Sequence, residues 1–331
     1  MNSAPLIRII TPALADANNG NWRTAHRWQA LLTQRPPGAN AAPNFQVIVQ
    51  GEWEGENCDL LIALHARRSA ASIARFCENF AAKPLIVVLT GTDLYRDLAT
   101  SEEARRSLRL ADSLIVLQED AIHFVPIEHR KKTHVVFQSA KPLGPYAKPK
   151  FKLNCVVVGH LRDEKDPSTI FRAAAQLNNS DHIHILHIGA PLDESLAKIA
   201  RTLSAHSKYY HWSGAMSHGL TRAAIKRAHL LIHPSIMEGG ANVIVEALTS
   251  GTSVLASHMS GNIGMLGPNY EGYFAVGDDA ALITLLKRVL RDANFKSRLG
   301  NACLARARLF LPETERASLC AIANRLLEPK A

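Results

Sequence analysis

The sequence predicts an α/β protein built from two doubly wound parallel sheets, and three observations carry this prediction. Apolar runs typical of buried strands alternate with helical segments through both halves of the chain. The chain has 331 residues, which is too long for one ordinary hydrophobic core. A stretch rich in proline and lysine, residues 139–152, lies between the halves and has the composition of a linker.

We therefore expect an N-terminal Rossmann-like domain over residues 1–143 and a C-terminal one over residues 144–312. In such sheets ligands bind at the carboxyl ends of the strands, at the point where the strand order reverses. Two such edges facing each other would form one deep cleft between the domains.

The first half contains apolar runs of strand length, each followed by a loop or a helical segment. Strands are expected over residues 6–11, 45–50, 59–65, 84–89, 113–118 and 134–138. Helices are expected to begin near Trp22 and near Ser69, and to span residues 102–111.

The second half repeats the pattern. Asp166 and Pro167 suit the N-cap and the first position of a helix. Strands are expected to end at Gly159 and to span residues 182–188, 209–212, 229–233 and 254–256. Helices are expected over residues 221–227, from Asn242, and over 279–291, 295–309 and 313–327, with a flexible loop over residues 258–267.

Composition narrows the function classes. The net charge is +9, but the basic residues are dispersed and several follow strand ends, so anionic small substrates are favoured over nucleic acid. No apolar run of about 18 residues predicts a membrane span, and the N-terminus lacks a signal-peptide pattern. The five cysteines are scattered, without zinc or disulfide spacing, which favours a cytoplasmic protein.

The stretch from Pro234 to Ser257 is the most informative part of the sequence. It predicts a strand end, a glycine turn at Gly239 and Gly240, and a helix opening near Asn242. Glycines let the backbone approach a ligand, and the amides at a helix start attract anions. Glu238 precedes the turn and Glu246 lies in the helix. Eight residues of helix rise about 12 Å, so the two carboxylates are expected to bracket a ligand rather than hold one atom.

Strand ends of the first half carry a second group of candidates. Asn19, Gly20 and Asn21 form a tight loop before a helix, and Arg23 and Arg27 share a face of that helix. Further candidates follow the strands expected over residues 59–65 and 84–89: His65, Arg67, Arg68, Thr90 and Asp93. Trp22 and Trp28 are either core residues or a stacking wall, and His65 is either a reactive or a structural histidine; core packing is favoured for the tryptophans.

The string from Pro-Ser through Glu238 to Glu246 resembles the donor-binding segment of retaining, family 4-like GT-B glycosyltransferases with a Glu-x7-Glu motif. The resemblance implies that Glu246 grips the ribose, that Glu238 lies near the transferred sugar, and that the amides of Gly239, Gly240, Ala241 and Asn242 hold the diphosphate. Gly189 is expected at the end of the strand over residues 182–188. Ala215 and Met216 are expected to line the pocket for the nucleotide base. The final helix, residues 313–331, is expected to cross back to the first domain.

Lys165 matches the lysine that neutralises the diphosphate in this family. His160 stands where the family has an arginine and Asp166 where it has a glycine, so Arg162 is our candidate for the missing charge. The alternative is that Arg162 and Lys165 are ordinary surface charges. Thr90 replaces the usual catalytic histidine, which leaves His65 as the candidate.

A narrower resemblance covers nearly the whole chain. The segments NNGNWRTAHRW, ALHARRSA, LTGTDLYRD, QSA and SGNIGML are similar to the selenosugar synthases of selenoneine biosynthesis. This resemblance implies a UDP-sugar donor (UDP-GlcNAc or UDP-glucose), selenophosphate as nucleophile and a new carbon–selenium bond. An anion pocket for selenophosphate is expected from Asn19, Gly20, Asn21, Arg23, Thr24, Arg27, Arg67, Arg68, Thr90 and Asp93. The pathway partners implied are a selenophosphate synthetase and an enzyme that uses the selenosugar.

No cofactor and no metal are expected. No Asp-x-Asp motif is present, and His182, His184 and His187 cannot all face one metal from a strand. Four other functions remain open: an ordinary transferase with a sugar, thiol or lipid acceptor, a sugar-nucleotide epimerase, a hydrolase, and a non-catalytic nucleotide-binding module.

Overall fold

The computed structural model describes the chain in four segments: residues 4–12, 20–34, 45–144 and 146–328.

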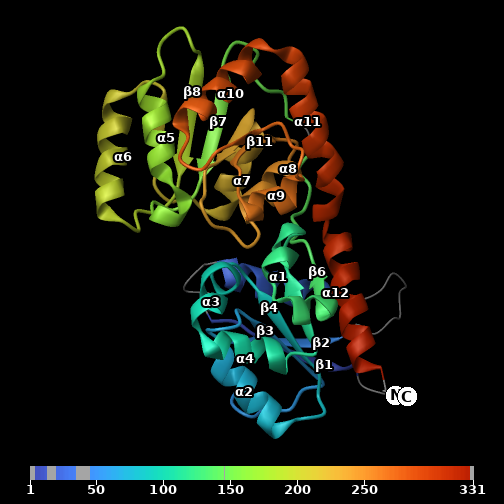
Figure 1. The fold of residues 1–331 in the computed structure, drawn as a ribbon. Coiled ribbons are helices and arrows are strands. Elements are labelled where there is room, and N and C mark those ends of the chain that lie inside the picture. Colours follow the sequence, from blue (N-terminus) through green and yellow to red (C-terminus); the bar gives the residue numbers. More distant parts are fainter. Residues whose placement is uncertain (1–3, 13–19, 35–44, 145, 329–331) are drawn as a thin grey trace. The chain divides into compact units, whose positions relative to one another are not determined.

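The chain divides into two compact units. The first comprises residues 1–138 together with 312–331, and the second comprises residues 139–311. Each unit contains one six-stranded sheet whose paired strands run parallel. The predicted α/β class with two Rossmann-like sheets is therefore confirmed (Figure 1).

The sheet of the first unit has the strand order β2-β1-β3-β4-β5-β6. Every residue of β3 (LLIAL) and β4 (LIVVL) is buried, as expected for parallel strands covered on both faces. The order reverses between β1 and β3, which pair directly, so this is the switch point of the first unit. The strands are β1 (Leu6–Ile10), β2 (Gln46–Gln50), β3 (Leu60–Leu64), β4 (Leu85–Leu89), β5 (Ser113–Val116) and β6 (Thr133–Val135).

Helices cover both faces of this sheet because right-handed crossovers leave the switch point in opposite directions. One core contains Trp28 of α1 and Leu319 of α12, and the other contains Phe76 of α2 and Leu108 of α4. The helices are α1 (Gly20–Leu32), α2 (Ala70–Asn79), the π-helical turn η2 (Asp93–Asp97), α3 (Leu98–Thr100), α4 (Glu102–Leu110), the 3-10 helices η3 (Asp120–Phe124) and η4 (Ile127–Lys132), and α12 (Pro312–Leu327).

Helix α12 belongs to the first unit although it begins 177 positions beyond the end of β6 in the sequence. The carboxylate of Glu315 is buried against α1, where it accepts hydrogen bonds from Arg27 Nε (2.8 Å) and Trp28 Nε1 (2.6 Å). Trp28 has no exposed surface, so it is a core residue, as favoured from the sequence. The end of the chain therefore completes the first core.

The sheet of the second unit has the order β12-β11-β10-β7-β8-β9. Its order reverses between β7 and β10, which pair directly, so the switch point of this unit lies there. The strands are β7 (Leu153–Val158), β8 (Ile183–Ile188), β9 (Tyr210–Trp212), β10 (Leu230–His233), β11 (Ser253–Ser257) and β12 (Tyr273–Phe274).

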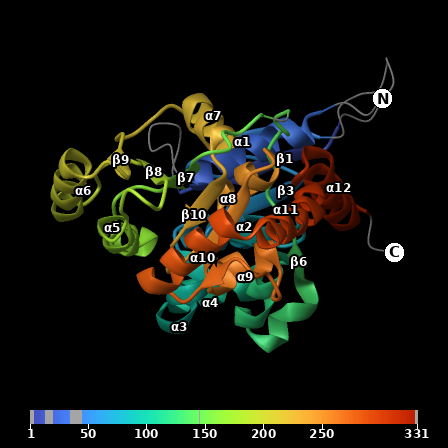
Figure 2. The ribbon, with the colours of Figure 1, turned by 90° about the horizontal axis from the view of Figure 1, so that it is seen from above.

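The helices of the second unit also follow the two crossover directions. Helix α6 packs against β9 and α5, while α7 packs against β7, and α8 against β10 and β11; Figure 2 shows α5 and α6 beside the β8–β9 side of the sheet. The helices are η5 (Asp163–Lys165), α5 (Pro167–Ala175), α6 (Glu194–His206), α7 (His218–Arg227), α8 (Asn242–Leu248), α9 (Ser260–Leu266), α10 (Asp279–Arg291), α11 (Ala293–Ala307) and η6 (Arg308–Phe310).

One expectation is corrected by this structure: the stretch over residues 258–267, expected to be a flexible loop, contains helix α9. The proline-rich stretch over residues 139–152 begins where the two units divide, after Gln138. It is hydrogen-bonded to the second unit, since Leu143 N donates to Thr249 O and Arg222 Nη2 donates to the carbonyl of Lys141.

Candidate functional site

The switch point of the second unit gathers two of the predicted residues. The loop after β7 carries Lys165 and the loop after β10 carries Glu238, and Lys165 Nζ donates a hydrogen bond to Glu238 Oε1. Both side chains are mostly buried, with 19% and 14% exposure. The two loops are also joined through their backbones, since Ile236 N donates to Glu164 O at 3.0 Å.

His233, the last residue of β10, completes this cluster. Its Nε2 lies 3.5 Å from the same Glu238 oxygen and has no hydrogen-bond partner among the described residues. Burial lowers the pKa of His233 to about 4 even though the Glu238 charge acts in the opposite direction. The ring is therefore neutral near pH 7. Sequence reasoning missed this histidine, although its position at the strand end was a usable signal.

The electrostatics of the cluster keep Glu238 ionised. Burial by itself raises the pKa of this carboxyl, but the Lys165 cation beside it lowers the pKa by more, so that the pKa lies below its ordinary value. The net arrangement is one cation and one carboxylate that are both mostly buried.

Backbone geometry fixes the Lys165 loop. Asp166 takes a left-handed conformation (φ 42°) and its carboxylate caps α5, accepting from Thr169 N at 3.2 Å. The predicted N-cap at Asp166, with Pro167 following it, is confirmed. Holding Asp166 in this conformation places its neighbour Lys165 at the sheet edge.

Helix α9 fixes the Glu238 loop. A Cβ on Gly261 would lie 2.2 Å from the backbone oxygen of Glu238, so only glycine permits this approach. Asn262 Nδ2 anchors the helix by donating to Ser257 O at 2.9 Å. The segment misread as a loop is thus part of the scaffold under Glu238.

Glu246 lies inside α8, and its side chain is 8% exposed. His218 Nε2, from the first turn of α7, donates to Glu246 Oε1 at 2.6 Å. His218 is a second contact that the sequence did not suggest. Because α8 begins only at Asn242, the segment between Glu238 and Glu246 is not a continuous helix, and the expected rise of about 12 Å does not apply.

The amides expected to hold a diphosphate are not equivalent. Ala241 is buried and its N–H donates to Met265 Sδ at 3.1 Å, so this amide is engaged within the fold. Gly240 and Asn242 are partly exposed, whereas Gly239 is buried.

Two further predicted residues have different surroundings from those expected. A Cβ on Gly189 would lie 1.8 Å from the carbonyl oxygen of Gly159, so Gly189 is needed for the close packing of the loops after β7 and β8. Arg162 is 48% exposed and lies 3.7 Å from Glu164. The structure pairs it with this carboxylate rather than with the Lys165 cluster.

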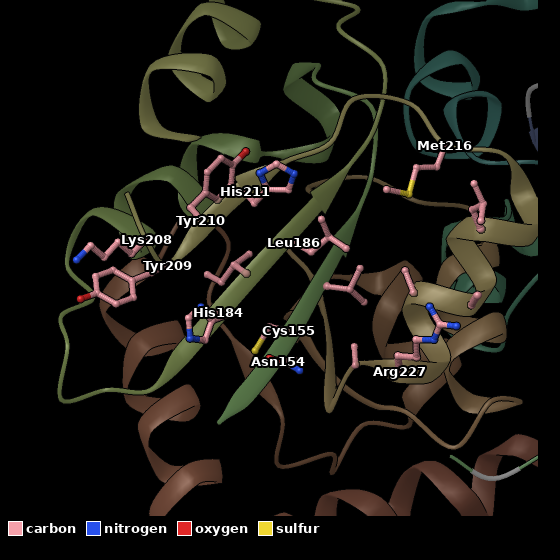
Figure 3. A pocket seen from close by; sticks show the side chains of 16 residues that line it. Asn154, Cys155, His184, Leu186, Lys208, Tyr209, Tyr210, His211, Met216 and Arg227 are labelled. Carbon is pink, nitrogen blue, oxygen red and sulfur yellow. The ribbon is translucent and has the colours of Figure 1, made fainter. Parts of the chain in front are cut away.

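Ala215 and Met216 lie on the exposed loop between β9 and α7. Met216 also lines a cavity of about 420 Å³ that extends along β7, β8 and β9 beneath α7 (Figure 3). His184 and Leu186 form part of its wall, and Glu238 and Lys165 do not line it. This cavity is therefore separate from the switch-point cluster.

In the first unit, the predicted residues after β3 and β4 form a connected group. His65 has a left-handed backbone (φ 74°) and is 2% exposed. Its Nδ1 accepts from Arg68 N at 3.3 Å, so the proton of the neutral ring is on Nε2, which lies 3.0 Å from Thr92 Oγ1. Burial lowers the pKa of His65 even though Asp93 acts in the opposite direction. These contacts favour the structural interpretation of His65.

Asp93 positions the same loops. It has no exposed surface, and its carboxylate accepts from the backbone N–H groups of Thr90, Gly91 and Ala66 at 2.8 to 2.9 Å. Asp93 therefore supports the loops instead of contacting an acceptor. Arg67, by contrast, is 43% exposed and pairs with Asp97 at 2.8 Å, and Arg68 is exposed.

The residues predicted at the start of α1 also differ from one another in burial and in hydrogen-bond partners. Arg27 is bound to Glu315 of α12, so its charge is compensated inside the first unit. Thr24 Oγ1 is buried and accepts from Gln138 Nε2 at 2.6 Å. Gly20 is exposed and Asn21 and Arg23 are partly exposed, while Asn19 lies outside the described residues.

Two kinds of feature are absent from the part of the chain that the structure describes. No group of three or more His, Cys, Asp or Glu side chains there is arranged to hold a metal ion. No helix there has both the length and the apolar character needed to cross a membrane.

Comparison with known proteins shows which family the segment around this cluster resembles. Residues 143–305, which include Lys165, Glu238 and Glu246, match the family described as glycosyl transferases group 1. No curated protein matches the sequence.

Solved structures resemble the chain over nearly its whole length. Anabaena HepE, solved with UDP and glucose, has a TM-score of 0.73 at 14% identity and covers 97% of this chain and 100% of its own. Sucrose-phosphate synthase from Thermosynechococcus elongatus has a TM-score of 0.77 at 16% identity, with 99% and 100% coverage. The pneumococcal O-GlcNAc transferase GtfA, solved with UDP and GlcNAc, has a TM-score of 0.65 at 17% identity, with 81% and 57% coverage.

At these identities the likeness to solved structures establishes the fold, whereas the sequence match covers the segment that holds the cluster. The chain thus has the GT-B fold of two Rossmann-like parallel-sheet domains, and its residues 143–305 match the glycosyl transferases group 1 family.

Proposed function

We propose that this protein transfers a sugar from a UDP-sugar to selenophosphate without a metal ion and forms a carbon–selenium bond. The single observation that carries the transferase part is the Lys165–Glu238 cluster at the switch point of the unit that matches the glycosyl transferases group 1 family. The choice of UDP is supported by HepE and GtfA, which have this fold and were solved with UDP.

Donor binding follows from three residues. Lys165 supplies a cation for the diphosphate, and Glu246 supplies an ionisable carboxylate that two ribose hydroxyls can donate to. His218, which holds Glu246 at 2.6 Å, fixes the orientation of that carboxylate. A buried charge with a defined partner keeps its geometry before the ligand arrives.

Bond cleavage places negative charge on the departing UDP. The electron pair of the bond between C1 and the phosphate oxygen goes to UDP, while a selenium electron pair forms the new C1–Se bond. Lys165 stabilises the charge that grows on the diphosphate. Glu238, ionised in the folded protein, suits the positive charge that develops at the sugar ring.

The acceptor assignment depends on the resemblance to selenosugar synthases and on the chemistry of the first unit. Arg67 and Arg68 present exposed cations beside the carboxyl ends of β3 and β4. Selenophosphate is an anion whose selenium is ionised near neutral pH, so it needs cations and no strong base. This agrees with the burial of His65 and with Thr90 at the position of the usual histidine. A selenophosphate synthetase would supply this acceptor, and an enzyme that uses the selenosugar would consume the product.

Mass spectrometry of products tests the proposal. The protein is incubated with UDP-GlcNAc or UDP-glucose and equal concentrations of selenophosphate, thiophosphate and phosphate. The expected result is UDP together with a sugar carrying selenium at C1. Free sugar and UDP alone would indicate a hydrolase, an isomerised UDP-sugar an epimerase, and transfer only to an added sugar or thiol an ordinary transferase. No consumption of any UDP-sugar would overturn the transferase assignment.

The variant Lys165→Ala tests the proposed role of this lysine in bond cleavage. It should lower turnover by about a hundredfold or more, as expected for loss of a group that stabilises transition-state charge. Lys208→Ala, which removes an exposed lysine from the same unit, is the control and should retain activity.

A further inference from the structure

The lysine proposed to bind the diphosphate is already occupied. In this structure Lys165 Nζ is paired with Glu238 Oε1, and both side chains are mostly buried. A single ammonium group held against a carboxylate is largely neutralised, so an incoming diphosphate must compete with Glu238 for it.

An alternative partner for Glu238 lies beside it. His233 Nε2 is buried, has no hydrogen-bond partner among the described residues and lies 3.5 Å from Glu238 Oε1. A buried polar atom without a partner has a cost in free energy and calls for an explanation. A small rotation of the Glu238 side chain would satisfy this atom.

We propose that Glu238 is a two-position switch, paired with Lys165 when the donor site is empty and hydrogen-bonded to His233 when a nucleoside diphosphate takes Lys165. This inference rests on the proposed function, because the displacing ligand is the diphosphate of the donor. His233 is then a positioning residue that acts through Glu238. Its neutral ring donates one hydrogen bond and adds no charge to the site.

The switch links donor binding to the placement of Glu238. Without a diphosphate, the carboxylate is held at Lys165. When a diphosphate is bound, the Glu238 carboxylate turns toward His233. A ligand without a phosphate does not release the carboxylate from Lys165. The energy of the Lys165–Glu238 pair is therefore subtracted from the affinity for UDP.

Isothermal titration calorimetry with UDP tests this competition. Glu238→Gln removes the competing charge and keeps the shape of the side chain. Because the competing charge is gone, we expect UDP to bind about tenfold more tightly to E238Q than to the wild-type protein. Glu164→Gln is the matched control: it removes a carboxylate that is 41% exposed, faces Arg162 and lies in the loop of Lys165, and it should change the affinity less than twofold.

A double-mutant cycle separates competition from a general loss of negative charge. In the Lys165→Ala background, Glu238→Gln has no lysine to release, so its tenfold gain should disappear. A gain of the same size in both backgrounds would overturn the switch. Thermal unfolding of each variant shows whether it is folded, and Glu238→Ala repeats the measurement should E238Q not fold.

Two variants test the second position. His233→Leu removes the donor that receives Glu238, so UDP affinity should fall about tenfold. His233→Gln restores a side-chain donor and should recover most of that loss, which a purely structural role would not predict. Absence of UDP binding by the wild-type protein would overturn the proposed function together with the switch. UDP binding that E238Q leaves unchanged or weakens would overturn the switch alone.

Discussion

At the scale of single residues, the second unit keeps uncharged histidines where its strands pass through the core. His187 of β8 is 1% exposed and lies 3.0 Å from Tyr210 Oη and 3.2 Å from Gly159 O. Burial lowers the pKa of His187, like that of His233, to about 4. An apolar environment therefore selects the neutral ring in both cases.

These pKa values predict acid sensitivity. The pKa of His187 falls from 6.5 in its ordinary state to about 4 in the fold, so the unfolded chain binds a proton more readily. The free energy of unfolding contributed by this residue is thus complete above pH 6.5 and is lost as the pH falls toward 4. Urea unfolding at several pH values should show the gap between wild-type and His187→Gln proteins narrowing over this range.

A matched control lies on the same strand. His184 of β8 is exposed, so the gap between the wild-type and His184→Gln proteins should not change with pH in this way. A gap for His187→Gln that stays constant from pH 7.5 to pH 4 would contradict the argument.

At the scale of elements, α8 and α9 show what the sequence reveals and what it conceals. The start of α8 at Asn242 was readable because a glycine turn precedes an apolar helical stretch. The segment containing α9 has glycine, serine and asparagine in its first residues, a composition that favours a loop. It is helical because tertiary contacts at Gly261 and Asn262 override that local preference.

The packing of α9 predicts the effect of one methyl group. Gly261→Ala places a Cβ 2.2 Å from the Glu238 carbonyl oxygen, so the Glu238 loop or α9 must move. A displacement of this kind should lower the turnover of UDP-sugar by about a hundredfold. Gly219→Ala in α7 is the control, since a Cβ there meets nothing within 4 Å, and its activity should equal that of the wild type. Equal activity of both variants would show that the contact is unimportant.

At the scale of the whole molecule, two switch points organise the chain. Lys165 and Glu238 are 73 positions apart, yet each follows a strand at the reversal of the second sheet, so their proximity was deducible once the strand order was known. The contacts of His218 and His233 were not deducible, because hydrogen-bond partners between loops depend on side-chain packing. The same holds for Arg27, whose charge suggested a ligand but whose partner is Glu315.

The dependence of the first unit on α12 gives a third prediction. Glu315→Gln removes the charge that compensates Arg27 and weakens the acceptor for Trp28, so the first unit should lose about 2–4 kcal/mol of stability. Tryptophan fluorescence during urea unfolding, measured in a Trp212→Phe background, reports this unit, since Trp22, Trp28 and Trp53 all lie in it. Glu313→Gln, which changes an exposed residue of the same helix, should leave the transition in place, and identical transitions for both variants would refute the assigned role of Glu315.

The position of α12 in the chain also sets an order of events during translation. The ribosome releases residues 139–311 before it releases residues 312–327, which the first core requires. The surface of the first unit that α12 covers therefore stays open until the end of synthesis, whereas every residue of the second unit is available earlier. The second core can be completed before the first, which is the reverse of the usual N-to-C order.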